Sequence, residues 1–157
     1  SLTHKKSVEY VKARNYSLVL KPLNFELGFK DNDFGYLSGG HSCAHLGYEL
    51  AVALEHEKIV LIGQDLAFGN DNITHADGHA YKREANEKYD KLEQALAYGG
   101  KGQVLSTAVW GVFRKEFELL FQKNKTPAYN CTEGGSRIEG AIEKPFKELC
   151  EIIKNEN

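Results

Sequence analysis

The chain has 157 residues, of which 41% are hydrophobic and 27% are charged, and this composition is typical of a globular protein rather than a disordered one. A formal net charge of −2 favours neither nucleic acid nor an anionic membrane as a partner. No segment has the roughly 20 apolar residues that cross a bilayer, and the first residues do not resemble a signal peptide. We therefore expect a single cytoplasmic domain over residues 1–157, which lacks Met throughout and is expected to be a piece of a longer protein.

The cysteine pattern argues against a disulfide-rich or zinc-binding protein. The cysteines are odd in number and have no paired spacing, which favours free buried thiols. They are Cys43, Cys131 and Cys150. No tight pair of acidic residues ends a predicted strand, so we expect a site that needs no metal.

The first third of the chain carries few clear signals. Residues 4–14 have the spacing of a short amphipathic helix, residues 17–20 that of a strand, and residues 24–40 show no sustained period. The next predicted helix covers residues 42–55, with Ser42 as its N-cap. Its expected buried face consists of Leu46, Leu50, Ala53 and Leu54.

Gly39 and Gly40 directly precede this helix. Backbone N–H groups at a helix N-terminus can bind phosphate, so the two glycines could form a phosphate cradle. A tight turn followed by a helix cap explains the same residues. We favour the turn, because a pair of glycines alone is a weak signal.

Residues 58–62 form the best predicted core strand, because large apolar and β-branched side chains follow one another without interruption. Gly63, Gln64 and Asp65 come directly after this strand. Ligands of open α/β sheets bind at the carboxyl ends of the strands, so Asp65 is the first candidate site residue. The polar loop that follows contains His75, for which a role as base and a place in a solvated turn both remain open.

The next part of the chain alternates between charged and apolar segments. The charges of residues 80–93 predict a solvated helix face or a mobile lid, and residues 92–98 fit either a helix or a strand. Glycines within 99–102 predict a turn, and Thr107 is expected to cap a helix over 108–123. The core face of that helix consists of Trp110, Phe113, Phe117, Leu120 and Phe121.

The last part of the chain repeats the order of strand, polar loop and helix. Residues 127–131 are a predicted strand, residues 132–140 a polar loop rich in glycine, and a final helix is expected from Glu143 with Pro145 in its first turn. Its packed side chains are expected to be Phe146, Leu149, Cys150 and Ile153.

This alternation predicts an α/β protein, a three-layer Rossmann-like sandwich with a mostly parallel sheet. Carboxyl ends of parallel strands lie at one edge of a sheet. We therefore expect the polar strand ends at Asp65, Thr107 and Thr132 to share one rim and to bind the ligand there.

Five motifs in order resemble the conserved core of the motility-associated factor (Maf) glycosyltransferases over residues 36–150. They are GGHSCAH at 39–45, IGQDLAF at 62–68, THA at 74–76, GGKGQVLST at 99–107 and NCTEGGSRIEG at 130–140. The resemblance implies a sialyltransferase-like domain that transfers a nonulosonic acid, pseudaminic or legionaminic acid, from a CMP-activated donor to Ser and Thr of flagellin. It implies a bacterial cytoplasmic enzyme that supports flagellum assembly and motility without a cofactor. Family members carry an upstream glycine-rich turn that we do not find, which suggests truncation and loss of independent activity.

This reaction requires a base for the acceptor hydroxyl and hydrogen-bond donors around the departing phosphate. The candidate catalytic residues are His75, Asp65 and Glu133. The candidate nucleotide-binding and sugar-binding residues are Gly39, Gly40, Ser42, Gln64, Thr107, Thr132, Gly134, Gly135, Ser136 and Arg137. The Arg137 guanidinium could bind the sugar carboxylate or the phosphate, and a surface ion pair is the alternative.

Two other functions remain open at this point. A related branch of the same superfamily contains archaeal 6-hydroxymethylpterin diphosphokinases, and under that alternative Asp65 would help to bind Mg²⁺ and the phosphates of ATP. A flagellin-binding module without catalytic activity is the third possibility. The expected partners are flagellin and a nucleotide-sugar donor.

Overall fold

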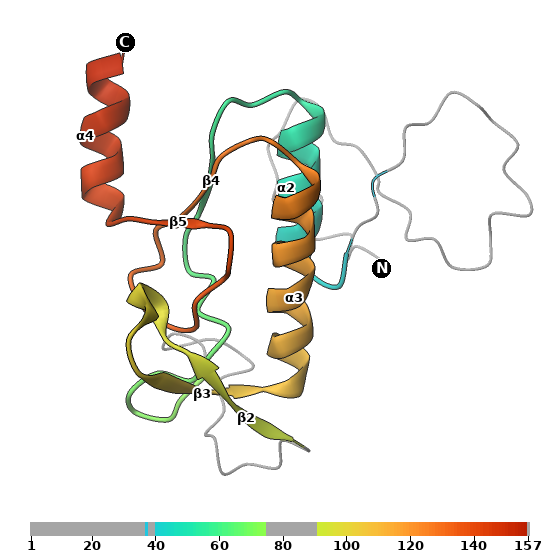
Figure 1. The fold of residues 1–157 in the computed structure, drawn as a ribbon, viewed down its shortest axis with the longest axis vertical. Helices are drawn as coiled ribbons and strands as arrows, with labels where there is room; N and C mark the ends of the chain where they lie inside the picture. The colour runs from blue at the N-terminus through green and yellow to red at the C-terminus, as the bar shows by residue number, and fades with distance from the viewer. Residues whose placement is uncertain (1–36, 38–39, 75–90, 157) are drawn as a thin grey trace, which may run out of the picture. The chain divides into compact units, whose positions relative to one another are not determined.

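The structure is a computed structural model that describes residues 37, 40–74 and 91–156. These residues belong to one compact unit, Leu37–Asn157, which is described here by itself (Figure 1). The sequence predictions that lie outside the described residues are those for 4–14, 17–20, 24–36, His75 and 80–90.

Helices and strands alternate along the described residues, which confirms the α/β class. The helices are α2 (Cys43–Ala53), α3 (Ala108–Lys123) and α4 (Phe146–Glu156). The strands are β1 (Ile59–Leu61), β2 (Leu92–Leu96), β3 (Gln103–Thr107), β4 (Ala128–Asn130) and β5 (Ile142–Glu143). Among the described residues, no helix is long and apolar enough to cross a membrane.

The three-stranded sheet has the order β1-β4-β5, and all of its pairs are parallel. The predicted strand at 58–62 is confirmed, but it is shorter and covers Ile59–Leu61, and Ile62 directly after it is 57% exposed. Among the described strands of this sheet, β4 lies in the middle and β1 at one edge. Leu61 pairs with Asn130 of β4, and Asn130 pairs with Glu143 of β5.

The strands β2 and β3 form a separate two-stranded antiparallel sheet. The expectation of a mostly parallel sheet is therefore wrong for this part of the chain. Its physical reason is the short connection, because parallel neighbours need a crossover of a dozen or more residues. The turn instead uses Gly99, Gly100 and Gly102 with positive φ angles of 79°, 73° and 79°. Residues 92–98, ambiguous in the sequence, are mainly strand. The charged segment 80–93 is expected to be a solvated helix face or a mobile lid, and its last two residues, Leu92 and Glu93, belong to β2.

Helices α2 and α3 contact each other and pack on the parallel sheet (Figure 1). The prediction for α3 is confirmed in its bounds, its Thr107 cap and its core face, where Phe117 is 0% exposed. The core cluster is made of Tyr48, Ile59, Leu61, Phe117, Leu120, Ala128 and Ile138.

The predicted buried face of α2 is wrong. Its buried residues are His45 and Tyr48, whereas Leu50 and Leu54 are 46% and 62% exposed. The rings of His45 and Tyr48 lie 4.3 Å and 6.5 Å from the ring of Phe117. Apolar residues surround this helix on several sides, so the aromatic partners on α3 decide which side is buried.

The last helix, α4, begins at Phe146 rather than near Glu143. Ile142 and Glu143 form β5 instead, and Pro145 precedes the helix. Leu149 is buried as expected, but Phe146 is 44% exposed.

The cysteines form no disulfide, as the sequence predicts, but they differ in exposure. Cys131 is buried, Cys150 is partly buried and Cys43 is exposed, so the expectation of burial is wrong for Cys43. Burial raises the pKa of the Cys131 thiol, which favours its neutral form.

Candidate functional site

The candidate site lies at the carboxyl ends of β1 and β4. These strands are parallel neighbours, so the segments that follow them leave the sheet at the same edge. The N–H of Cys131 donates to the carbonyl oxygen of Leu61 at 2.9 Å, which extends the pairing by one step. Beyond it, the N–H of Gln64 donates to Oγ1 of Thr132 at 3.1 Å. The predicted polar ends after β1 and β4 therefore meet.

Hydrogen bonds of Ser136 connect the segment after β4 to the segment after β1. Its N–H and its hydroxyl donate to the carbonyl oxygen of Asp65 at 2.7 Å and 3.1 Å, and the hydroxyl also lies 3.2 Å from the carbonyl oxygen of Leu66. Ser136 is 0% exposed. Its polar groups are thus used to hold the segment that carries Asp65, in place of the ligand contact predicted for them.

Gly135 permits this close approach. Its φ angle is +70°, in the left-handed region that favours glycine, and a Cβ at this position would collide with the backbone of Asp65. The next residue along the loop is Ser136, so a side chain at position 135 would also push its hydrogen bonds apart. Gly135 therefore has a structural reason to be glycine, independent of any ligand.

The strand β3 reaches the same region from the antiparallel sheet. The hydroxyl of Ser106 donates to the carbonyl oxygen of Leu66 at 2.8 Å, and the N–H of Phe68 donates to the carbonyl oxygen of Leu105 at 2.8 Å. Thr107 is used differently, because its Oγ1 accepts from the N–H of Trp110 as the cap of α3. The segments that contain Asp65 and Thr132 thus lie at one rim, as predicted. The side chain of Thr107 instead caps helix α3.

Ser42 and Gly40 belong to the start of α2. Nε2 of His45 lies 2.9 Å from the carbonyl oxygen of Phe113, which can only accept, so Nε2 carries the proton and Nδ1 accepts from the N–H of Ser42 at 3.0 Å. The hydroxyl of Ser42 accepts from the N–H of His45, which completes a capping box. Gly40 has a φ angle of +48° and packs against the His45 side chain. The turn-and-cap interpretation is confirmed at these residues, and Gly39 lies outside the described part.

His45 itself is 0% exposed, and burial lowers the pKa of its imidazole. The His45 imidazole forms hydrogen bonds at the start of α2 and with α3. It is therefore a neutral, structural residue of the core.

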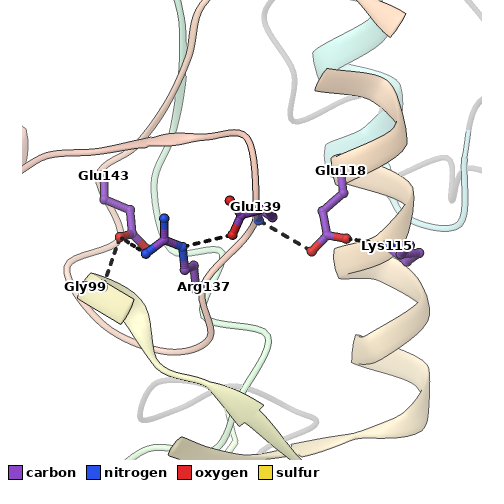
Figure 2. Close-up of polar contacts among 6 residues, drawn as sticks. All are labelled: Gly99, Lys115, Glu118, Arg137, Glu139 and Glu143. Atoms are coloured by element: carbon purple, nitrogen blue, oxygen red, sulfur yellow. Dashed lines mark hydrogen bonds and ion pairs between the residues drawn. The ribbon is translucent and has the colours of Figure 1, made fainter. Parts of the chain in front are cut away.

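Arg137 lies in a network of ion pairs (Figure 2). Its Nε is 3.2 Å from Oε2 of Glu139 and its NH1 group is 3.8 Å from Oε2 of Glu143, which also accepts from the N–H of Gly99 at 3.1 Å. The N–H of Glu139 donates to Glu118 of α3 at 3.4 Å. The network joins the glycine turn to α3, and an anion would have to compete with two carboxylates for the guanidinium.

Glu133 supports the beginning of α4. Its Oε1 accepts from the N–H of Phe146 at 2.9 Å, where a negative charge is favoured by the helix dipole. The backbone of Glu133 has a φ angle of 62°. Its carboxylate therefore has a structural partner, which leaves it less available as a base than the exposed carboxylate of Asp65.

The groups left for a ligand are fewer than predicted. Asp65 is exposed, Gln64 and Thr132 are partly buried, and no described residue pairs with the Asp65 carboxylate. A Cβ added at Gly63 or Gly134 would meet nothing within 4 Å, so open space lies beside both segments. One carboxylate, one amide and one hydroxyl beside open space can hydrogen-bond the hydroxyl and phosphate groups of a polar ligand. The described residues contain no group of three or more side chains of the types that hold a metal ion.

Sequence reasoning missed Asn130 at this site. Asn130 ends β4, is 0% exposed, and its Oδ1 accepts from the N–H of Thr132 at 3.1 Å. Asparagine is seldom fully buried, so its place in a predicted core strand directly before the polar loop was a signal that could have been used.

Comparisons with known proteins identify one similar family. A protein-family model described as "6-hydroxymethylpterin diphosphokinase MptE-like" matches residues 1–71 of the 157 residues. No curated protein and no solved structure matches the chain. The matched residues include α2, β1 and the segment that carries Gln64 and Asp65. One side of the candidate site thus lies within a segment that is similar to MptE-like domains.

Proposed function

We propose that the chain is part of a nucleotide-dependent transferase that binds its nucleotide at the carboxyl ends of β1 and β4. The observation that carries this proposal is the contact between Gln64 and Thr132, which brings the polar segments after two neighbouring parallel strands together. Such an edge is where open α/β sheets bind ligands. The similarity of residues 1–71 to a family described by a diphosphokinase agrees with a transferase.

The specific reaction we propose is transfer of a nonulosonic acid from a CMP-activated donor to Ser or Thr hydroxyls of flagellin. Its support is the resemblance of the motifs over residues 36–150 to the Maf glycosyltransferases. In this reaction CMP leaves as a phosphate anion that does not need strong protonation. Hydrogen-bond donors around this phosphate therefore matter more than a general acid. In this proposal Thr132 and the backbone at Gly134 supply donors, and the Asp65 carboxylate accepts from a sugar or acceptor hydroxyl. His75 keeps its proposed role as base.

A second candidate is transfer of a diphosphate group from ATP to a hydroxymethylpterin. The matching family is described by this activity, which favours the second candidate. The exposed carboxylate of Asp65 would then help to hold Mg²⁺, which prefers carboxylate and phosphate oxygens. The two candidates use the same edge of the sheet and differ in the nucleotide and in the need for Mg²⁺.

Thermal unfolding with added nucleotide tests the proposal. CMP should raise the Tm without Mg²⁺ under the first candidate, whereas ATP should do so with Mg²⁺ under the second. A ligand at 100 times its Kd stabilises the folded state by about 2.7 kcal/mol, which is readily measured. Asp65→Asn should reduce the shift, and Glu57→Gln, which removes one exposed charge elsewhere, should not. Equal Tm values with and without both nucleotides would refute a nucleotide site, and flagellin binding without any such shift would favour a non-catalytic module.

A further inference from the structure

Asn130 has one polar group without a partner. Its carbonyl oxygen accepts from the N–H of Lys144 at 3.2 Å and from the hydroxyl of Tyr98 at 3.3 Å. Its side-chain Oδ1 accepts from the N–H of Thr132 at 3.1 Å. Its Nδ2 is buried and has no hydrogen-bond partner among the residues that the structure describes. The residue is therefore well bonded except for the amide donor.

The orientation of this amide is fixed by its neighbour. A backbone N–H can only donate, so the atom of Asn130 that faces Thr132 must be the oxygen, and exchanging the oxygen and nitrogen would oppose two donors. A buried donor left without an acceptor costs about 1–3 kcal/mol. We therefore expect at Nδ2 an acceptor that the described residues do not provide.

The position of the amide points to the bound ligand as that acceptor. Asn130 is tied to the first N–H of the loop at Thr132, and Oγ1 of Thr132 is in turn bonded to Gln64. Open space lies beside Gly63 and Gly134 on the two segments that meet here. The Asn130 side chain bonds to the N–H of Thr132, two residues before Gly134, so it lies at the base of one of these two segments.

We infer that Asn130 is a ligand-binding residue whose Nδ2 donates to an anionic oxygen of the nucleotide or nucleotide-activated group. The inference rests on the proposed function and extends its site to a residue at the end of the middle strand. A carboxamide is neutral, so it holds a phosphate or carboxylate oxygen by a directed hydrogen bond without a counter-ion. Binding of such an oxygen also satisfies a buried donor, which increases the gain on binding.

The variant Asn130→Asp tests this inference. Aspartate has nearly the same shape and keeps an oxygen for the N–H of Thr132, but it replaces the donor by an acceptor. We expect the Kd for CMP, or for ATP with Mg²⁺, to rise at least tenfold. The matched control is Asn124→Asp, which removes a side-chain bond to the carbonyl oxygen of Leu120 at the end of α3 and should leave the Kd unchanged.

A measurement on the unchanged protein covers the case in which Asn130→Asp does not fold. The side-chain amide signals of Asn130 in a ¹⁵N–¹H spectrum should shift when CMP or ATP with Mg²⁺ is added. Two results would overturn the inference and leave the nucleotide site intact, provided that the wild-type protein binds the nucleotide. One is an unchanged Kd in Asn130→Asp, and the other is that the Asn130 amide signals of the wild-type protein do not move. An absence of wild-type binding to either nucleotide would overturn the proposed function together with it.

Discussion

Gly135→Ala should separate the two segments of the candidate site. The substitution places a Cβ against the backbone of Asp65, at a position with a φ angle of +70°. A left-handed conformation costs a non-glycine residue about 1–2 kcal/mol, and each hydrogen bond of Ser136 that is lost costs about 1 kcal/mol. We therefore expect a loss of about 2–4 kcal/mol in the free energy of unfolding.

The matched control is the neighbouring glycine. Gly134 has no positive φ angle, and a Cβ there meets nothing within 4 Å, so Gly134→Ala should change stability by less than about 1 kcal/mol. Both variants would be compared by urea unfolding, with the slope m checked for a change in two-state behaviour. Equal free energies of unfolding in the two variants would refute the close contact between the loop and Asp65.

Three other changes test the roles assigned to buried polar groups. Tyr48→Phe removes a core hydroxyl for which no described residue is a hydrogen-bond partner, so urea unfolding should show equal or higher stability, and a loss above about 1 kcal/mol would speak against this placement. Burial lowers the pKa of His45 below its ordinary 6.5, so the folded state keeps this imidazole neutral at pH values where the unfolded state already binds a proton. Stability should therefore fall as the pH drops from 6.5 through the lowered pKa, and measurably less so in His45→Gln. Thr107→Ala should cost about 1 kcal/mol through loss of the α3 cap without changing nucleotide affinity, whereas a weaker affinity with unchanged stability would return Thr107 to the ligand site.

The sequence was most informative where one pattern had one explanation. The helix α3 was predictable to its end residues, because its aromatic side chains recur at a helical period and Thr107 stands directly before them. For α2 the start was predictable from Ser42, but the buried face was not. Apolar residues lie on several sides of that helix, and the choice between them depends on rings of α3 that are distant in the sequence.

Strand direction was the main failure of prediction for the fold. A hydrophobic run indicates a strand but not whether its neighbour is parallel, and the turn at 99–102 was too short for a parallel connection. The convergence of the segments at 65 and 132 was predictable, since it needs only that β1 and β4 run in the same direction.

Which polar groups stay available at the site could not be predicted from the sequence. Ser136 and Arg137 have residue types suited to a nucleotide, yet the hydroxyl of Ser136 bonds to a carbonyl oxygen 71 residues away and Arg137 is paired with Glu139. Such partners are set by tertiary packing. Asn130 shows the converse, because its unpartnered amide becomes apparent only once its surroundings are known.

The most direct test of the nucleotide site is the set of backbone amide shifts in a ¹⁵N–¹H spectrum during titration with CMP and, separately, with ATP and Mg²⁺. The largest changes should fall on the two segments after β1 and β4, at Gln64, Asp65, Thr132 and Gly134. Saturable changes confined to α4 or to the β2-β3 hairpin would place the ligand elsewhere and contradict the proposed site.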